Sequence, residues 1–330
     1  MKNILNRLIN QETLSKLEAK DVLVRISQNQ YNASQIACFM TVFMMRNCTI
    51  EELSGFREAL LELCVSVDFS QYNTIDLCGT GGDGKDTFNI STLASFVVAG
   101  TGIKVAKHGN YGVSSISGSS NVIENLGIKL SNDNTFLQKS IDKANIAILH
   151  APLFHPAMKN VASIRKELAV KTFFNILGPL VNPSSPKNQM VGVYNLELAR
   201  MYSYVFQNTT TNFCILHGLD GFDEISLTDQ TKIISKTSET ILNPESFKVS
   251  KITLEQIKGG ATIKDTTQIF QEIINGKGTL AQNNVVCANA AVAISTVQSC
   301  SVLEGFEKAK ESLLSGKAAQ KMKILQDLSK

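Results

Sequence analysis

Apolar residues recur with a helical period along the first part of the chain, from residue 1 to about 66. Ile36 and Phe39 lie on one face of a predicted helix that has Ser34 near its start as a candidate cap. Another helix is predicted over residues 50–63. This part of the chain is therefore predicted to be entirely helical.

Beyond Thr74 the pattern changes to short apolar runs separated by segments with helical spacing. Parallel strands covered by helices on both faces are apolar along their whole length, because neither face meets water. The alternation of such runs with helices predicts a mainly parallel central sheet, flanked by helices and joined by right-handed crossovers. The runs are TIDLCG, GIKVAKHG, IAILHAP, MVGVY and NFCILHG.

A charged helix and a proline-containing loop, at about 156–187, interrupt this alternation and are expected to pack with the N-terminal helices. The predicted fold class is therefore α/β, with a small all-helical domain and a larger domain built on the sheet. The helical domain comprises 1–66 joined by about 156–187, and the larger domain comprises 67–155 and 188–330. Within the latter, a Thr- and Ser-rich stretch from about 227 to 265 is expected to form strands or a hairpin.

Composition and charge narrow the class of protein. Hydrophobic residues make up 43% and charged residues 18% of the 330 residues, which is typical of a globular chain. The formal charge of +3 permits an anionic small-molecule substrate and does not favour nucleic acid, for which a concentrated basic face is expected. The seven cysteines form no C-x-x-C pair, and no apolar run approaches the roughly 18–20 residues of a membrane span. With an N-terminus that lacks an apolar signal core, we expect a reduced, cytoplasmic protein with no membrane partner.

The glycine-rich stretch DLCGTGGDGKDTFNIST, residues 76–92, joins a predicted strand to a helix expected to begin near Ser91. Such loops bind phosphates, because glycines expose backbone N–H groups and the helix N-terminus adds positive charge. A dinucleotide site needs an acidic residue at the end of the next strand, where this chain has Lys107. A nucleoside-triphosphate loop needs Ser or Thr after Lys85, where this chain has Asp86. The loop is therefore predicted to bind another phosphate or a sugar hydroxyl, with a simple helix cap as the alternative.

A second loop, KHGNYGVSSISGSSNVIENLG over residues 107–127, also leads from a strand into a helix. It combines a lysine with serines and glycines, which suits a second anion site. Neighbouring parallel strands end at the same edge of a sheet, so the two loops are expected to line one crevice. Two such sites indicate a substrate that carries phosphates at both ends.

An acidic pair, Asp223 and Glu224, follows the predicted strand NFCILHG and belongs to the same edge. Carboxylate oxygens suit Mg²⁺, which bridges to substrate phosphates. A solvated acidic turn is the alternative, and the two anion loops favour the metal site. The four histidines are far apart and have no cysteine partners, which argues against a structural zinc site.

Taken together, the motifs resemble those of the anthranilate phosphoribosyltransferases over nearly the whole chain. The resemblance rests on DLCGTGGDG, TFNIST, KHGN with SSxSGS, HPAMK, RKEL, NILGPLxNP and HGLDGFDEIS, in that order. It implies a small helical domain, a larger α/β domain and a homodimer formed through the helical side. It also implies transfer of the phosphoribosyl group of 5-phosphoribosyl 1-pyrophosphate to the amine of anthranilate, with Mg²⁺, in tryptophan biosynthesis.

The resemblance also implies the site residues, with Lys107 and Arg165 in electrostatic and positioning roles and no general base. The implied metal positions are Ser91, Asp223 and Glu224. The implied anthranilate contacts are Gly79, His108, Asn110, His155 and Arg165. The implied phosphoribosyl-pyrophosphate contacts are Gly79, Gly82, Asp83, Thr87, Asn89, Ile90, Ser91, Thr92, Lys107, His108, Gly109, Asn110, Tyr111, Gly112, Val113, Ser114, Ser115 and Ser119.

The chain departs from the family pattern in several places. Tyr111 and Gly112 stand where the family usually has Arg followed by Ala or Ser, so a cation is missing from the second loop. Ser163 replaces a usual proline, Lys171 a frequent arginine, and Asn121 a common aspartate. Two rival functions are a pyrimidine nucleoside phosphorylase and a non-catalytic nucleic-acid-binding relative; the GTGGD and DEIS motifs and the low net charge favour the transferase.

Overall fold

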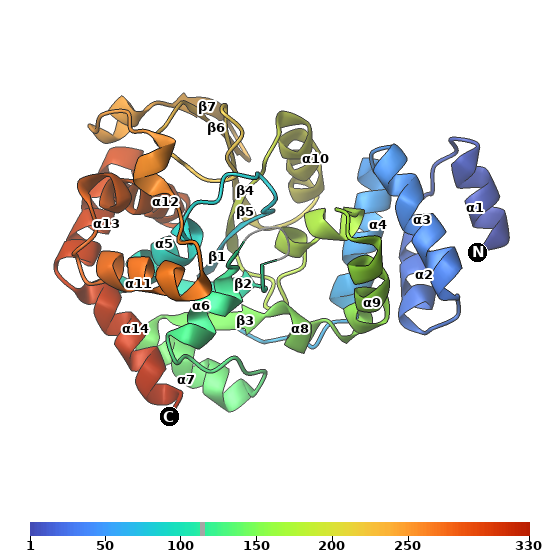
Figure 1. Cartoon of the computed structure of the whole chain (residues 1–330), viewed down its shortest axis with the longest axis horizontal. Coiled ribbons are helices and arrows are strands. Elements are labelled where there is room, and N and C mark those ends of the chain that lie inside the picture. The colour runs from blue at the N-terminus through green and yellow to red at the C-terminus, as the bar shows by residue number, and fades with distance from the viewer. Residues whose placement is uncertain (113–115) are drawn as a thin grey trace. The chain divides into compact units, whose positions relative to one another are not determined.

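The computed structural model describes the chain except residues 113–115. The chain divides into two compact units (Figure 1). The helical unit comprises Met1–Val67 and Ala151–Ser185, and the α/β unit comprises Asp68–His150 and Pro186–Lys330. Both units are therefore assembled from separate stretches of the chain.

The helical unit is built around an aromatic core that joins its two stretches. The ring of Phe173 stacks on Phe56 with centroids 4.6 Å apart, and Phe39 meets Phe56 edge-on at 6.0 Å. Asn32, not Ser34, caps the helix that carries Phe39, because Asn32 and Gln35 form a reciprocal capping box. The α-helices are α1 (Lys2–Ile9), α2 (Lys16–Ser27), α3 (Ala33–Met45), α4 (Ile50–Glu62), α8 (Ala151–Phe154) and α9 (Lys159–Leu168), and the 3₁₀ turns are η1 (Pro156–Met158), η2 (Phe173–Ile176) and η3 (Gly178–Leu180).

The α/β unit contains a seven-stranded sheet in the order β3-β2-β1-β4-β5-β6-β7. The first five strands of this order are parallel, and β6 and β7 add an antiparallel hairpin at one edge. The predicted fold class, with a mainly parallel sheet beside a small helical domain, is confirmed. The strands are β1 (Thr74–Gly79), β2 (Lys104–Gly109), β3 (Ile146–His150), β4 (Asn188–Gly192), β5 (Asn212–Gly218), β6 (Thr231–Ser235) and β7 (Glu239–Leu242).

Helices cover both faces of this sheet. Figure 1 shows α5 and α11 to α14 gathered on one side of the strands and α10 on the other. The Thr- and Ser-rich stretch 227–265 forms a hairpin only in its first half; beyond it lie the 3₁₀ turns η4 (Pro244–Phe247) and η5 (Leu254–Ile257). The α-helices of the unit are α5 (Ile90–Gly100), α6 (Ser119–Asn125), α7 (Asn134–Ala144), α10 (Leu196–Gln207), α11 (Ile263–Ile274), α12 (Leu280–Gln298), α13 (Val302–Leu314) and α14 (Lys317–Leu328).

No single helix among the described residues is both long and apolar enough to cross a membrane.

The strand order reverses at β1. From β1 the chain proceeds to β2 and β3 on one side, and it later returns to place β4 and β5 on the other. In an open α/β sheet, the loops that leave the carboxyl ends of two strands on either side of such a reversal run in opposite directions. Open α/β sheets bind ligands in the crevice between such loops, and the predicted site loops start here.

Candidate active site

Two glycines at the reversal point support the acidic turn. Gly79 ends β1, Gly192 ends β4, and the two are paired in register. A Cβ atom on Gly192 would lie 1.5 Å from the carbonyl oxygen of Asp223, and one on Gly79 would lie 2.3 Å from its Oδ2. Only glycine allows the turn after β5 to pack this closely over the ends of both strands.

The acidic turn itself is tied to the two elements that face it. Asp223 is 8% exposed, and its Oδ2 accepts a hydrogen bond from the backbone N–H of Gly81 at 2.7 Å. Glu224 is half-buried, and its Oε1 accepts from the backbone N–H of Ser91, at the start of α5, at 2.9 Å. The alternative of a solvated acidic turn is therefore wrong for this pair.

Burial and the charge of neighbouring carboxylates raise the pKa of both carboxyls. For Asp223, desolvation has the larger effect and the nearby charge of Asp83 adds to it. For Glu224, desolvation is again first and the charge of Asp223 second. Raised pKa values at adjacent carboxyls indicate that too little positive charge lies near them, and a bound cation would provide that charge.

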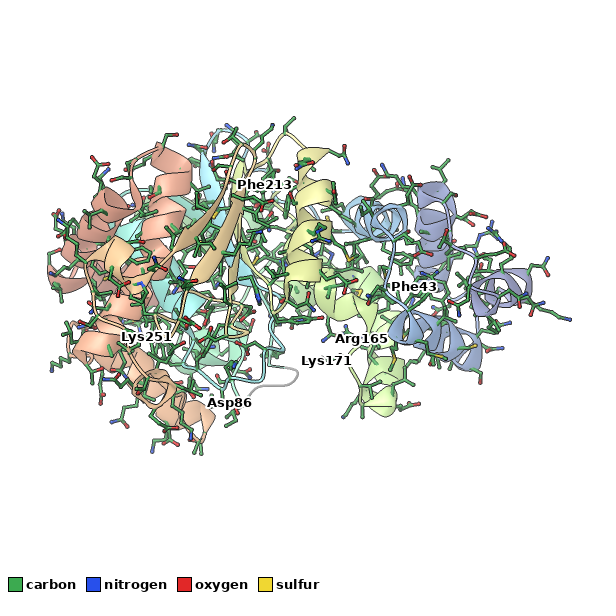
Figure 2. The ribbon with its side chains drawn as sticks, turned by 90° about the horizontal axis from the view of Figure 1, so that it is seen from above. Phe43, Asp86, Arg165, Lys171, Phe213 and Lys251 are labelled. Carbon is green, nitrogen blue, oxygen red and sulfur yellow. The ribbon has the colours of Figure 1, made fainter. Side chains whose placement is uncertain are left out.

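The glycine loop pairs through its backbone with a segment that is distant in the sequence. The backbone N–H of Gly259 donates to the Asp86 carbonyl at 2.7 Å, and that of Phe88 donates to Ile257 at 3.4 Å. The ammonium of Lys85 lies over the ring of Phe222, 4.9 Å from the centroid. Lys85 therefore does not have the role of the phosphate-binding lysine in a nucleoside-triphosphate loop. Asp86 belongs to this loop (Figure 2). Its φ of 49° places its backbone in the left-handed region.

Asn89 begins α5 without capping it through its side chain. Its Nδ2 donates instead to the carbonyl of Ser117, at 3.1 Å, and so links the first loop to the second. The Oδ1 atom of Asn89 is buried and has no hydrogen-bond partner among the described residues. The simple helix cap that was the alternative for this loop is therefore not what the side chain does.

Lys107, near the end of β2, is buried and reaches the neighbouring strand β1. Its Nζ donates to the carbonyl oxygen of Leu77, on β1, at 2.5 Å. Burial lowers the pKa of Lys107, while the nearby charges of Asp76, Cys78 and Glu224 oppose this effect. The carboxylate of Asp76 also accepts from the backbone N–H of His108, at 3.1 Å, so the ends of β1 and β2 are joined by side chains.

The second loop closes on itself. Asn121 Oδ1 accepts hydrogen bonds from the backbone N–H groups of Gly112, at 3.0 Å, and Gly118, at 2.9 Å. A Cβ atom on Gly118 would lie 2.2 Å from the Gly112 nitrogen, so the two ends of the loop approach to contact distance. Ser119 Oγ adds a bond of 3.3 Å to the Asn110 carbonyl. The predicted contacts Val113, Ser114 and Ser115 lie outside the described residues.

Tyr111 turns toward the protein. Its hydroxyl donates to Glu124 Oε1 at 3.1 Å, and its ring meets that of His150 edge-on with centroids 4.6 Å apart. His150 in turn bonds the hydroxyl of Ser120 through Nδ1 at 2.8 Å. The residue that replaces the family's usual arginine therefore anchors the loop to α6 and β3.

The remaining predicted contacts, His155 and Arg165, belong to the helical unit. Arg165 lies on α9 (Figure 2) and is half-buried. Its guanidinium lies 5.5 Å from the centroid of Phe174, and burial lowers its pKa. Burial lowers the pKa of His155 to about 4, so its ring is neutral at pH 7. A half-buried arginine on a short helix differs from the solvated arginine that is typical of charged helices.

The donor set of the acidic turn fits Mg²⁺. Within the described part of the chain no group of three His, Cys, Asp or Glu side chains has the arrangement of an all-protein metal site. Mg²⁺ is usually bound through one or two carboxylates, with waters and substrate phosphates as its other ligands. Asp223 and Glu224 offer that number of hard oxygen donors at a place where positive charge is deficient.

Three side chains that shape the site were not among the predicted residues: Asp76, Asn121 and Asn289. Asp76 and Asn289 carry a signal in the sequence, because each is a lone polar residue inside a buried apolar run. Such a residue needs hydrogen-bond partners inside the protein, so it indicates a specific contact. Asn121 carries no such signal, since it lies among serines in a polar loop.

Comparison with known proteins identifies the family. The model described as "Glycosyl transferase family, a/b domain" matches residues 71–319, and "Glycosyl transferase family, helical bundle domain" matches residues 2–64. The anthranilate phosphoribosyltransferase of Flavobacterium psychrophilum is 71% identical over 329 residues, and that of Christiangramia forsetii 64%; the alignments cover 100% of this chain and 100% and 99% of those proteins.

Solved structures agree with these relatives. Anthranilate phosphoribosyltransferase from Thermus thermophilus superimposes with a TM-score of 0.91 at 28% identity, covering 98% of both chains. The enzyme from Saccharomyces cerevisiae, in complex with PRPP and Mg, also gives 0.91 at 28% identity, covering 98% of this chain and 96% of that one. The chain therefore belongs to the anthranilate phosphoribosyltransferase family.

Proposed function

We propose that this protein transfers the phosphoribosyl group of 5-phosphoribosyl 1-pyrophosphate to the amine of anthranilate, giving N-(5-phosphoribosyl)anthranilate and pyrophosphate. The observation that carries the proposal is the acidic turn, with Asp223 buried and Glu224 half-buried, at the point of the sheet where β1 and β4 end. The structure of the yeast relative with PRPP and Mg, and another with 4-fluoroanthranilate, support the same substrates. The reaction belongs to tryptophan biosynthesis, and we assign it to the cytoplasm.

The phosphoribosyl pyrophosphate would lie between the two loops. Residues 79–92 supply backbone N–H groups at the start of α5, where the helix dipole favours an anion. Residues 107–112 and Ser119 come from the neighbouring strand end, and Lys107 adds a buried positive charge. Asn89 connects the two loops through Ser117 and leaves a buried acceptor for a substrate hydroxyl.

Asp223 and Glu224, with Ser91 adjacent, would hold Mg²⁺. When bound there, Mg²⁺ neutralises negative charge on the pyrophosphate. The two carboxylates must be ionised for this role, and the cation itself favours ionisation by opposing their repulsion. The turn would therefore supply the protein ligands of the cation, and substrate phosphates would add to them.

The chemistry requires charge stabilisation more than proton transfer. As the bond from ribose C1 to the pyrophosphate oxygen breaks, its electron pair leaves with pyrophosphate, and positive charge develops on the sugar. Backbone N–H groups of the first loop and Lys107 stabilise the leaving group. The neutral aromatic amine then bonds to C1 and loses a proton to solvent, so no general base is assigned. Arg165 would pair with the anthranilate carboxylate and position the amine, with Gly79, His108, Asn110 and His155 as the other contacts.

A fluorescence assay that follows anthranilate consumption tests this proposal directly. We expect turnover that requires both phosphoribosyl pyrophosphate and Mg²⁺ and that stops when a chelator removes the metal. Phosphate-dependent cleavage of pyrimidine nucleosides, without anthranilate turnover, would instead identify the protein as a nucleoside phosphorylase. Binding of DNA without either reaction would favour the non-catalytic alternative.

Arg165 provides a residue-level test of the anthranilate site. Replacing Arg165 with Ala should raise the anthranilate KM about ten- to a hundredfold, the equivalent of about 1.5–3 kcal/mol for a lost charge-assisted hydrogen bond. The KM for phosphoribosyl pyrophosphate should stay unchanged. Lys166→Ala, at the exposed neighbour on the same helix, is the matched control. An anthranilate KM that is equal in wild type and Arg165→Ala would remove Arg165 from the site.

A further inference from the structure

Asn289 is a buried polar side chain in the middle of α12. It is 1% exposed, and the residues on either side of it in the helix are small, apolar and buried. Burying a primary amide costs free energy unless its donors and acceptor are hydrogen-bonded. The partners of this side chain therefore indicate what it does.

Both ends of the Asn289 amide bind the backbone of one residue on the acidic turn. Its Oδ1 accepts from the N–H of Ile225 at 3.0 Å, and its Nδ2 donates to the carbonyl of Ile225 at 2.8 Å. Nδ2 also donates to the Val285 carbonyl, one helical turn back, at 2.9 Å. A backbone N–H only donates and a carbonyl only accepts, so these partners determine the orientation of the amide.

Ile225 directly follows the two carboxylates, and the three residues are held by three different elements. Asp223 is held by the backbone of Gly81 and Glu224 by that of Ser91. Both of these contacts use carboxylate oxygens that a metal ion would also engage. The side chain of Asn289 contacts only the main chain of the turn, at Ile225. It can therefore hold the turn whether or not the two carboxylates bind a cation.

We propose that Asn289 is a positioning residue that sets the main-chain geometry of the acidic turn for binding a divalent cation. The inference rests on the proposed function, because it assigns the cation to Asp223 and Glu224. Asn289 acts through Ile225 and contacts neither the cation nor a substrate. Loss of such supporting contacts around a metal site typically weakens metal affinity about 10- to 100-fold.

The far end of the turn is held without Asn289. The hydroxyls of Ser226 and Thr228 hydrogen-bond at 2.6 Å, and Ser226 Oγ also accepts from the backbone N–H of Thr228 at 3.2 Å. These contacts do not involve Asn289. Replacement of Asn289 is therefore expected to shift the main chain around Ile225 and to leave the fold intact.

The test is a titration of the purified enzyme with Mn²⁺ alone, in which the free ion is followed by its electron paramagnetic resonance signal. Asn289→Leu, which keeps the size but removes the amide, should raise the Mn²⁺ dissociation constant about 10- to 100-fold. The anthranilate KM should stay unchanged, while the Mg²⁺ concentration for half-maximal activity rises. Asn283→Leu is the matched control, because Asn283 lies on the same helix and its Nδ2 donates to the carbonyl of Gly278, which is not part of the acidic turn.

The outcomes separate a positioning role from a merely structural one. A folded Asn289→Leu enzyme with the Mn²⁺ affinity of the wild type would overturn the proposal. If Asn289→Leu does not fold, Asn289→Ser keeps a small polar group at the buried position and is judged by the same titration. Failure of the proposed function is distinguishable, since it appears as wild-type enzyme that consumes no anthranilate, whatever its Mn²⁺ affinity.

Discussion

Asp223 and Glu224 show how position changes the chemistry of ordinary carboxylates. Isolated aspartate and glutamate ionise near pH 4, but here burial and, second to it, the charge of neighbouring carboxylates raise the pKa of both. In the folded, metal-free protein these groups hold protons at pH values where the unfolded chain has released them. Stability contributed by the protonated groups is complete below the unfolded pKa values and is lost as pH rises through the folded ones.

Replacing Asp223 with Asn should therefore stabilise the metal-free protein while it abolishes metal binding. We expect the Tm of Asp223→Asn to exceed that of wild type at pH 8 without Mg²⁺, and the difference to shrink as pH is lowered toward 4. Mg²⁺ should raise the Tm of wild type, more at higher pH, and leave the variant unchanged. Thermal unfolding across pH measures both effects.

Asp229→Asn is the control for this experiment, because Asp229 is an exposed carboxylate whose side chain retains 45% of its accessibility. Its Tm should follow wild type at every pH. A Tm of Asp223→Asn that is lower than wild type at pH 8 would contradict the view that the carboxylate is destabilising without a cation.

Tyr111 shows that a single substitution can change how a loop is held. An arginine at this place would offer a cation to the phosphates, whereas Tyr111 bonds Glu124 and packs on His150. Asn121 replaces a common aspartate yet still accepts two backbone N–H bonds, because a carboxamide oxygen has two lone pairs. Tyr111, Gly112 and Gly118 are therefore held by contacts within the protein itself.

The ends of β1 and β4 act together as one platform. Their final glycines are paired in register, and the acidic turn lies so close above them that no side chain fits at either place. The distance between the acidic turn and the glycine loop therefore depends on the register of the two strands and on glycine at both strand ends.

Gly192→Ala tests this platform, because its Cβ would lie 1.5 Å from the Asp223 carbonyl oxygen. We expect the turn to be displaced, the Mg²⁺ requirement to rise at least about tenfold, and stability to fall by about 1–3 kcal/mol. Gly178→Ala, at a glycine with no heavy atom within 4 Å of the added carbon, should change stability by less than about 0.5 kcal/mol. Urea unfolding and a Mg²⁺ titration give the two readouts, and equal results for the two variants would rule the platform out.

In the helical unit, Glu52 joins three elements through one buried carboxylate. It is fully buried and accepts hydrogen bonds from both terminal nitrogens of Arg46, at 2.6 and 2.9 Å. It also accepts from the backbone N–H groups of Leu14 and Thr49, at 2.9 and 2.8 Å. Burial acts to raise the pKa of Glu52, but these hydrogen bonds outweigh it and bring the pKa below its ordinary value.

Glu52→Ala should destabilise the protein by about 3–5 kcal/mol at pH 7, because it leaves Arg46 without its buried partner. The stability from Glu52 is present above the unfolded pKa of about 4.3 and is lost as pH falls through the folded value. The difference in unfolding free energy between wild type and Glu52→Ala should therefore decrease as the pH is lowered. Glu58→Ala, which breaks the exposed pair with Lys16, should cost less than about 1 kcal/mol. A Glu52→Ala cost as small as that of Glu58→Ala, measured by urea unfolding, would refute the assignment.

Considered as a whole, the molecule pairs a helical unit with an α/β unit, and each unit uses two stretches of chain. The helical unit exposes several large apolar side chains, with Met45 at 82%, Leu17 at 76% and Ile9 at 58%. Such residues on a small helical unit suit a contact with a second copy. We propose that the protein acts as a homodimer through this unit.

Light scattering after size-exclusion chromatography tests the oligomer. We expect a particle of twice the 36.0 kDa chain mass for wild type and of one chain mass for Met45→Asp, because an unpaired charge is costly to bury in an interface. Leu280→Asp is the control, because Leu280 is 77% exposed but lies in the α/β unit. A wild-type monomer, or a Met45→Asp dimer, would show that this surface is not the interface.

Periodicity and motif order were sufficient for much of this molecule. The helical beginning, the strands of the parallel sheet and the loops that leave them follow from the sequence, because element type depends mainly on local patterns of apolar residues. The excluded nucleotide patterns also follow from single positions, namely Lys107 and Asp86. The cap at Asn32 and the short turns after β7 did not follow from the sequence. For the cap, the reason is that Asn32 and Ser34 are both residue types that cap helices, and only the local geometry decides between them.

Only the tertiary structure decided how the site residues meet. Asp223 bonds Gly81 across 142 residues, and Asn289 bonds Ile225 across 64. Contacts at such separations depend on how crossover helices bring strand ends together, which no local pattern encodes. The sequence by itself determined that a phosphate-binding α/β protein of this family would form; packing alone decided that its acidic turn is buried, close to two glycines and held by an amide from α12.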